Sequence, residues 1–225
     1  GANILVKKGD ALIAFNTDGR GCVGYLERTG FSFDGAKVAV CGTGPTALAI
    51  LHAAAIAGAS EVLLLSRDKE RAREVLDRYV DEFGTLAHAT VDLQAAVDGH
   101  RSFLTAYDET TFKFGSYTTS TQAIAAADLV INATPLGMRE GDPAPFDVSL
   151  FHEGQHAFDV VYAHGETAFA AGAKAAGCTF ADGGGMLVAQ AVATVQAVCD
   201  VSGIDCELSF DELFEIMANA AGFNV

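Results

Sequence analysis

The sequence predicts an α/β fold in which helices cover both faces of a doubly wound parallel sheet. Short apolar runs that suit buried strands alternate along the chain with helix-like segments, and this alternation is typical of parallel sheets. A glycine-rich turn joins one of these runs to an alanine-rich segment. Half of the 225 residues are hydrophobic, so the chain can bury a sizeable core within one or two domains.

The glycine-rich turn follows an apolar run at residues 38–41 and opens the alanine-rich helix. It reads Gly42-x-Gly44-x-x-Ala47, with Pro45 where the first helical residue should be. Between a strand and a helix this pattern is the Rossmann-like fingerprint, because glycines let backbone amides approach a pyrophosphate whose charge the helix N-terminus favours. The alternative is an ordinary strand–helix turn, since short glycine motifs recur by chance.

The other elements follow from apolar periodicity and turn residues. A hairpin turned by residues 7–10 should lead into the polar segment 16–19. Further on, Gly84 should end a charged amphipathic helix, the glycines at 183–185 should interrupt the pattern, and residues 94–121 should form an irregular excursion. The expected strands are 3–6, 11–15, 38–41, 61–65, 87–91, 129–132, 156–161 and 178–181, and the expected helices are 21–29, 46–57, 69–83, 121–127, 166–176, 186–201 and 209–220.

Charged residues follow the strand that succeeds the alanine-rich helix. This strand ends in Ser66-Arg67-Asp68, and Arg71 lies one helical turn later. Arginine at this place suits the phosphate of NADP, whereas an acidic residue suits the ribose hydroxyls of NAD. Two guanidinium groups favour NADP in so acidic a chain, while Asp68 keeps NAD as the less favoured cofactor. The alternative is a solvated helix start whose charges pair with one another.

Composition limits the partners. The formal net charge is −15 with only 14 Lys and Arg, which argues against nucleic acids and anionic membranes because both require basic patches. We expect no stretch long enough to cross a membrane and no signal peptide. The five cysteines are scattered without a C-x-x-C pair, as expected for reduced thiols in a cytoplasmic protein.

One stretch matches a metal-binding pattern by its letters. His152-Glu153-Gly154-Gln155-His156 reads H-E-x-x-H, as in zinc proteases. That chemistry needs both histidines on one face of a helix, but Gly154 interrupts the stretch and a strand-like run follows it. We therefore expect no metal site here.

A series of ordered motifs resembles one family, the shikimate dehydrogenases, over nearly the whole chain. Residues 132–138 match its N-A-T-P-L-G-M segment in full, which is highly specific. The turn at Gly42 resembles its G-x-G-G-A-A loop, with Pro45 and Thr46 as departures. Residues 3–6 resemble G-A-x-N-T-L-V, 16–19 are N-T-D-G, 66–72 resemble N-R-T-x-x-R-A, 159–167 resemble D-x-x-Y-x-P-x-x-T with His164 in place of proline, and 182–191 match the family's last motif.

The resemblance implies reversible hydride transfer between NADPH and 3-dehydroshikimate, giving shikimate, in aromatic amino-acid biosynthesis. It implies that Asp18 is catalytic and partners a lysine, whose ammonium can protonate the alkoxide that forms as hydride arrives. The implied substrate-binding residues are Asn3, Asp18, Tyr162 and Gln190. The implied cofactor-binding residues are Gly42, Thr43, Gly44, Pro45, Thr46, Ala47, Ser66, Arg67, Asp68, Arg71, Ala133, Thr134, Val160, Gly183 and Met186.

One part of the family pattern has no counterpart in the sequence. In the family, a first domain carries the catalytic lysine and two serines that hold the substrate carboxylate, and nothing similar precedes Asn3. We therefore expect a fragment that binds NADP(H) with negligible turnover. The lysines that lack the family's catalytic context are Lys7, Lys8, Lys37, Lys69, Lys113 and Lys174.

The resemblance also implies a division of the chain. Residues 1–19 would be a remnant of the substrate domain, 20–185 the NADP-binding domain, and 186–225 helices that pack toward the substrate domain. Apolar surface left without its cover should be exposed and should lead to self-association. The alternatives are a quinate/shikimate dehydrogenase that uses NAD and a non-catalytic dinucleotide-binding module.

Overall fold

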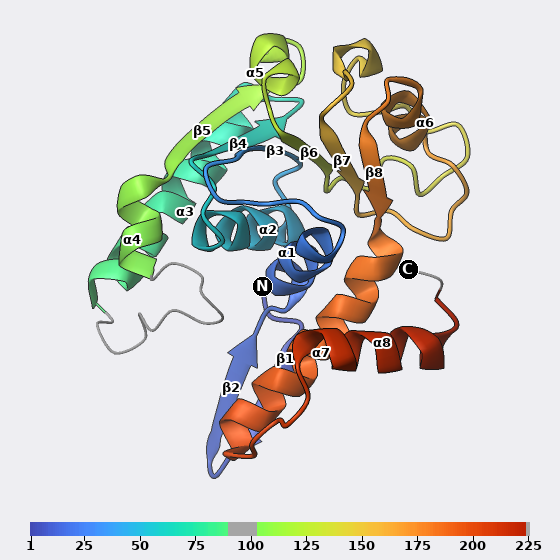
Figure 1. The fold of residues 1–225 in the computed structure, drawn as a ribbon. Helices are drawn as coiled ribbons and strands as arrows, with labels where there is room; N and C mark the ends of the chain where they lie inside the picture. The colour runs from blue at the N-terminus through green and yellow to red at the C-terminus, as the bar shows by residue number, and fades with distance from the viewer. Residues whose placement is uncertain (90–102, 224–225) are drawn as a thin grey trace.

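The computed structural model describes residues 1–89 and 103–223, and its centre is a six-stranded parallel sheet (Figure 1). The strand order is β5-β4-β3-β6-β7-β8. The chain therefore starts in the middle, winds outward to one edge, returns to the middle and winds outward to the other, which is the doubly wound order that the sequence predicts. The strands are β3 (Lys37–Cys41), β4 (Glu61–Ser66), β5 (Thr111–Ser116), β6 (Leu129–Asn132), β7 (His156–Asp159) and β8 (Thr179–Asp182).

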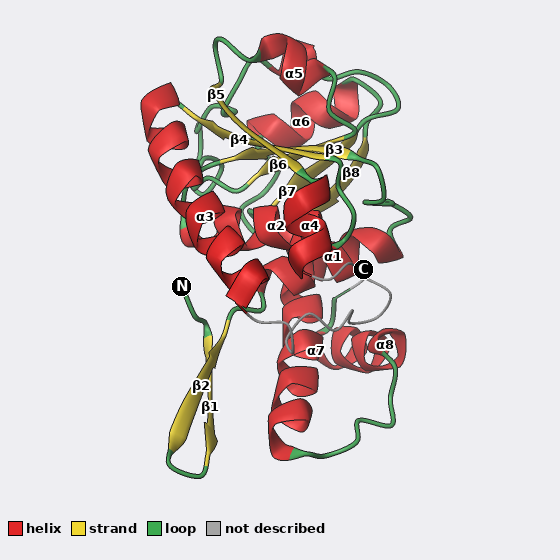
Figure 2. Ribbon diagram, turned by 90° about the vertical axis from the view of Figure 1, so that its left-hand side faces the viewer, coloured by secondary structure: helices red, strands yellow, loops and turns green. Residues whose placement is uncertain are grey.

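Helices cover both faces of this sheet, as the edge-on view in Figure 2 shows. Val38 and Val40 point into the core shared with α1, α2 and α3, and the alternate residues Ala39 and Cys41 point into the core on the face of α5 and α6. Helix α4 packs on α3 outside the sheet. The helices are α1 (Asp18–Arg28), α2 (Pro45–Ile56), α3 (Lys69–Ala89), α4 (Phe103–Glu109), α5 (Thr121–Ala125), the short η2 (Val148–Leu150) and α6 (Ala168–Ala175).

A hairpin and the last two helices extend away from the sheet (Figure 1). The hairpin pairs β1 (Ile4–Lys8) with β2 (Ala11–Phe15), and only residues 9 and 10 form its turn. Helix α7 (Gly183–Ser202) starts at the end of β8, and α8 (Phe210–Ala221) folds back against it. The hairpin, α7 and α8 therefore form a second region, which we call the outer region.

Helix α1 connects the two regions through three glycines that face three different neighbours. A Cβ on Gly19 would lie 2.2 Å from a backbone oxygen of α2, and a Cβ on Gly21 would lie 2.5 Å from the side chain of Gln190 in α7. A Cβ on Gly24 would lie 2.6 Å from the ring of Phe210 in α8. Since these separations are too short for a methyl group, glycine allows α1 to sit close to all three helices.

The expected end of α3 at Gly84 was wrong, and so was the strand expected at 87–91. The helix continues through Gly84 to Ala89, and residues 90 and 91 lie outside the described residues. A Cβ on Gly84 would lie 2.8 Å from the ring of Tyr107, so this glycine makes room for α4 instead of ending α3. The irregular excursion expected at 94–121 was also wrong where it is described, because α4 and β5 occupy residues 103–109 and 111–116.

The glycines at 183–185 do not interrupt the chain but form the first turn of α7. A Cβ on Gly183 would lie 2.1 Å from the carbonyl oxygen of Val160, and a Cβ on Gly185 would lie 2.0 Å from the ring of Tyr25. Asp182 caps this turn by accepting a hydrogen bond from the amide of Gly184 at 2.9 Å. Close packing, not a loop, explains Gly183 and Gly185.

The expectation that no stretch is long enough to cross a membrane was wrong for α7. The helix has 20 residues and a mean hydropathy of 1.4, so by length and composition alone it is a candidate span. Half of its apolar window is buried inside the fold, where Val188 and Val192 pack against α8. The core helix of a globular domain has this same composition.

Candidate functional site

The turn between β3 and α2 has the geometry that the sequence predicts. Gly42 has a φ of +119°, and a Cβ there would lie 2.7 Å from the carbonyl oxygen of Ala133. Gly44 is the N-cap of α2, followed by Pro45 at the first helical position. Apart from its chain neighbours, no atom of the described residues lies within 4 Å of the place where a Cβ on Gly44 would be. The first turn of α2 therefore begins at an uncrowded place beside the carboxyl ends of the paired strands β3 and β6, as an anion site at a helix N-terminus requires.

The carboxylate of Asp68 has a structural role at the end of β4. Its Oδ1 accepts a hydrogen bond from the amide of Glu70 at 3.0 Å, in the first turn of α3. The amide of Asp68 in turn donates to Oγ of Ser66 at 3.3 Å. Asp68 is thus explained as the cap of α3, which weakens its reading as a ligand of ribose hydroxyls.

Arg67 and Arg71 lie beside this cap with their side chains exposed. Within the described part of the chain neither of them pairs with a carboxylate. The ion pairs of α3 are made instead by Arg73, with Glu70 at 2.8 Å and with Asp77 at 3.6 Å. Both guanidinium groups predicted to bind phosphate are therefore available.

A buried polar network shapes the loop after β6. The side-chain nitrogen Nδ2 of Asn132 donates to Asp159 Oδ1 at 2.9 Å and to the carbonyl of Leu136 at 3.0 Å. The side-chain oxygen Oδ1 of Asn132 accepts from the hydroxyl of Thr134 at 2.7 Å. Thr167 donates to the other oxygen of Asp159 at 2.6 Å. Burial raises the pKa of Asp159, and these hydrogen bonds oppose the rise. The network fixes Ala133 and Thr134 at the carboxyl end of the sheet.

Asp18 is the centre of a second cluster, which we call the Asp18 cluster. Its Oδ1 accepts hydrogen bonds from Asn3 at 2.9 Å and from Gln190 at 2.8 Å, and its Oδ2 accepts one from the hydroxyl of Thr46 at 2.9 Å. Asn3 also holds Thr17, through a bond of its oxygen to the Thr17 amide at 3.0 Å. Three of the four predicted substrate-binding residues are thus brought together from the hairpin, α1 and α7.

The fourth predicted substrate residue, Tyr162, lies after β7. A Cβ on Gly183 would lie 3.1 Å from its ring and 2.1 Å from the carbonyl oxygen of Val160, so these three residues are adjacent. Tyr162 is 38% exposed, whereas Met186 is 3% exposed and packs in the core beneath them. Among the described residues Tyr162 has no hydrogen bond to the Asp18 cluster.

Two features of the site were missed by sequence reasoning. Thr46 was expected only as part of the cofactor turn, yet its hydroxyl belongs to the Asp18 cluster. The single sequence signal was that threonine departs from the alanine of the family pattern. The partnership of Asn132, Asp159 and Thr167 was also missed, although all three residues belong to motifs quoted above.

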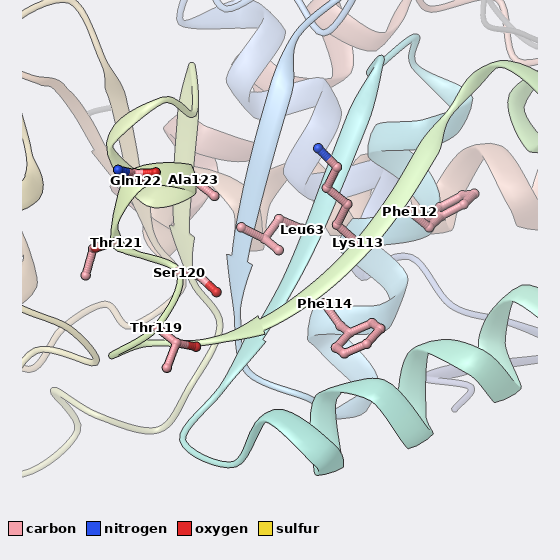
Figure 3. A pocket seen from close by; sticks show the side chains of 9 residues that line it. All are labelled: Leu63, Phe112, Lys113, Phe114, Thr119, Ser120, Thr121, Gln122 and Ala123. Carbon is pink, nitrogen blue, oxygen red and sulfur yellow. The ribbon is translucent and has the colours of Figure 1, made fainter.

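The H-E-x-x-H residues do not share a helix. His156 lies in β7 with its ring against Phe31, while both ring nitrogens of His152 bond to backbone oxygens, of Glu153 at 2.8 Å and of Ala125 at 2.9 Å. A cavity of about 540 Å³ lies elsewhere, along the edge strand β5 (Figure 3). Its lining contains none of the predicted site residues and comprises Leu63, Phe112, Lys113, Phe114, Thr119, Ser120, Thr121, Gln122 and Ala123.

Known proteins resemble this chain in sequence and in fold. No family model matches the sequence. A shikimate dehydrogenase (NADP(+)) of Moorella thermoacetica is 34% identical over 192 residues, which make up 85% of this chain and 57% of the relative. The chain thus spans less than three fifths of the length of this relative.

Solved structures share the fold. The ligand-free 5-ketofructose reductase of a Gluconobacter strain superposes with a TM-score of 0.70 at 25% identity, over 97% of this chain and 68% of that one. Shikimate 5-dehydrogenase from Listeria monocytogenes, in complex with shikimate and NAD, has a TM-score of 0.71 at 21% identity, over 96% and 67%. The Rossmann-like fold is confirmed, and this chain is a homologue of the shikimate dehydrogenases over 85% of its length.

Proposed function

We propose that this chain binds NADP(H) across the carboxyl end of its sheet and forms the dinucleotide-binding part of a shikimate dehydrogenase. The observation that carries the proposal is the bond between Thr46 Oγ1 and Asp18 Oδ2, at 2.9 Å. Through it the turn predicted to bind the cofactor touches the carboxylate predicted to bind the substrate. Substrate and cofactor must meet in this way for hydride to pass directly between them.

The residues present fit the cofactor. Free space beside Gly44 and the start of α2 suit the pyrophosphate. Arg67 and Arg71 suit the phosphate that distinguishes NADP from NAD, since a guanidinium group binds phosphate oxygens in pairs. Asp68, as the cap of α3, offers less to the NAD alternative. Ala133, Thr134, Val160 and Gly183 lie at strand ends where the nicotinamide would reach.

When bound, the reduced cofactor supplies the hydride. The chain's own residues would orient the substrate: Asn3, Gln190 and Tyr162 by hydrogen bonds to its hydroxyls, and Asp18 as an acceptor. Oδ1 of Asp18 already accepts two hydrogen bonds and Oδ2 only one, among the described residues. Oδ2 therefore keeps a lone pair for a substrate hydroxyl or for an ammonium group.

The proton donor for the alkoxide is proposed to come from outside this chain. Lys113 pairs with Glu61, and Lys174 pairs with Glu166 at 2.9 Å. No lysine of the described residues bonds to Asp18. We infer that the chain alone binds NADP(H) with negligible turnover, and that residues 1–19 and 186–225 face the domain that carries the lysine.

Calorimetric titration with NADP+ and NAD+ tests the cofactor proposal. We expect Arg67→Gln and Arg71→Gln each to weaken NADP+ binding by roughly tenfold or more, the size of a lost charge-assisted hydrogen bond, and to leave NAD+ binding unchanged. Arg73→Gln is the control, because it removes the same charge from α3, the helix that carries Arg71 and begins just after Arg67. Equal losses in all three variants would contradict the phosphate site. Preference for NAD+ in the unaltered chain would favour the quinate/shikimate alternative.

Activity separates the enzyme from the binding-module alternative. We expect no shikimate-dependent formation of NADPH by the pure chain, and we expect shikimate to bind weakly near Asp18. Normal turnover would overturn the inference that the proton donor lies outside the chain. NADP+ binding without any effect of shikimate on it would favour a module that only binds dinucleotide.

A further inference from the structure

Thr46 takes part in two features of the molecule, one through its backbone amide and one through its side-chain hydroxyl. Its backbone amide belongs to the first turn of α2, where amide groups have no acceptor within the helix and point outward. Its side-chain hydroxyl donates to Oδ2 of Asp18 at 2.9 Å. Thr46 therefore joins the proposed pyrophosphate site to the Asp18 carboxylate.

The packing of α1 against α2 and α7 positions Asp18 for its hydrogen bond with Thr46. Asp18 starts α1, and Gly19 beside it lets α1 approach the backbone of α2 so closely that a Cβ would lie 2.2 Å from Ala49. Gly21 brings Gln190 of α7 against the same turn of α1. The two oxygens of Asp18 are therefore held differently: Oδ1 by Asn3 and Gln190 from the outer region, and Oδ2 by Thr46 from the cofactor turn.

The chain departs from its family pattern at this point. The G-x-G-G-A-A loop has alanine where Thr46 stands, and alanine cannot donate a hydrogen bond. The link between the cofactor turn and Asp18 is thus made by a residue that the resemblance does not explain.

We propose that Thr46 is a positioning residue that couples occupation of the dinucleotide turn to the orientation of the Asp18 carboxylate. The inference rests on the proposed function, since it needs a dinucleotide at the first turn of α2. A ligand that orders this turn would also fix the Thr46 hydroxyl and, through it, Asp18. The coupling is reciprocal, so the bond to Asp18 would also hold the turn ready for the ligand.

Nuclear magnetic resonance of the whole chain, with aspartate isotope-labelled at the side-chain carboxyl carbon, measures this coupling. The Asp18 resonance is identified as the one missing from the spectrum of Asp18→Asn. Four proteins are compared with and without NADP+: the unaltered chain, Thr46→Val, Thr46→Ser and Thr85→Val. Valine keeps the shape without the hydroxyl, and serine keeps the hydroxyl. Thr85 is an exposed control, whose hydroxyl donates to the carbonyl of Asp81 in its own helix, at 2.8 Å.

We expect NADP+ to shift the Asp18 resonance in the unaltered chain, in Thr46→Ser and in Thr85→Val, and to leave it unmoved in Thr46→Val. We also expect Thr46→Val to lose roughly threefold to tenfold in NADP+ affinity, with Thr46→Ser close to the unaltered chain. A purely structural role would lower affinity in both Thr46 variants alike and would not separate valine from serine.

The two proposals fail differently. If NADP+ does not bind the unaltered chain, the proposed function is wrong and the coupling is overturned with it. If NADP+ binds but the Asp18 resonance responds in Thr46→Val as it does in the unaltered chain, only the coupling is overturned. Thermal unfolding of each variant, read by circular dichroism, shows that the folded proteins are being compared, and Thr46→Ser decides the matter should valine prevent folding.

Discussion

The six-stranded sheet with helices α1–α6, which we call the sheet region, and the outer region differ in how completely they bury their own apolar side chains. In the sheet region the inner strands are fully covered: Val40, Leu64 and Ile131 are 0% exposed and pair across β3, β4 and β6. In the outer region, Leu5 and Leu12 of the hairpin are 66% and 69% exposed. Ile204, Leu208 and Ile216, in and beside α7 and α8, are exposed as well.

This difference shows which region covers its own apolar surface and which does not. A two-stranded hairpin is at best marginally stable alone, and here it stands apart from the sheet (Figure 2). The Asp18 cluster lies where the regions meet, because Asn3 and Gln190 come from the outer region and Thr46 from the sheet region. The proposed site therefore lies between the well-buried sheet region and the outer region, whose apolar side chains are partly exposed. The predictions below test that contrast.

Glycine substitutions should give the largest difference between the regions. Gly42→Ala puts a Cβ 2.7 Å from the backbone of Ala133 at a φ of +119°, so we expect a loss of about 4 kcal/mol of stability. Gly9 in the hairpin turn also has a positive φ, of +60°, but no described residue other than its chain neighbours lies within 4 Å of a Cβ placed there by Gly9→Ala. We expect a loss of about 1 kcal/mol there. Urea unfolding measures both, and equal losses would remove the contrast in packing.

His52 of α2, which faces Tyr79 of α3, should make the stability of the sheet region depend on pH. Nδ1 of His52 bonds to the hydroxyl of Tyr79 at 2.9 Å, with the ring of Phe83 4.8 Å away. Burial lowers the pKa of His52 from 6.5 to about 4. Between these values the unfolded chain binds a proton that the folded chain does not, so stability falls as the pH falls.

We expect His52 to account for a loss of roughly 2–3 kcal/mol between pH 6.5 and pH 4. The raised pKa of Asp159 acts in the opposite direction, so the contribution is measured as the difference between the unaltered chain and His52→Gln. The variant should be less stable at pH 7 and should lose less stability on acidification. Parallel pH profiles for the two proteins would contradict the assignment.

Features that depend on neighbouring residues could be predicted from the sequence, whereas features that depend on the packing of distant segments could not. The alternation of strands and helices follows from local apolar patterns. The cofactor turn does so too, since Gly42, Gly44 and Pro45 act within a few residues of one another. The helix expected at 46–57 ends at Ile56, and Gly58 just beyond it has a φ of +112°, which favours glycine. Gly84 looks the same in sequence, but it is a packing glycine whose reason, the ring of Tyr107, is more than twenty residues away. The bond from Thr46 to Asp18 was out of reach for the same cause, since it depends on how closely α1 and α2 approach.

Helix α8 tests how the outer region is attached. The guanidinium of Arg28 in α1 pairs with Asp211 and Glu215 of α8 and lies 4.4 Å from the centre of the Phe214 ring. We expect Arg28→Gln to cost about 1 kcal/mol of stability, because the carboxylates are exposed and such pairs are weak in water. Arg28→Lys should recover only part of it, since an ammonium group cannot bond to both carboxylates in the same flat arrangement. Full recovery would mean that charge alone holds α8.

The exposed face of the hairpin should affect association and leave stability almost unchanged. Leu5 and Leu12 lie on one face of the hairpin, since β1 and β2 pair Leu5 with Ala14 and Leu12 with Lys7. We propose that this face joins copies of the chain, because exposed apolar patches favour association. The double variant Leu5→Ser, Leu12→Ser should shift sedimentation toward the monomer while changing stability by less than about 0.5 kcal/mol. Met138→Ser is the matched control, as Met138 is 52% exposed but belongs to the sheet region. If Met138→Ser reduces association equally, the hairpin face promotes association no more than any exposed apolar side chain. The two regions would then not differ in their tendency to associate.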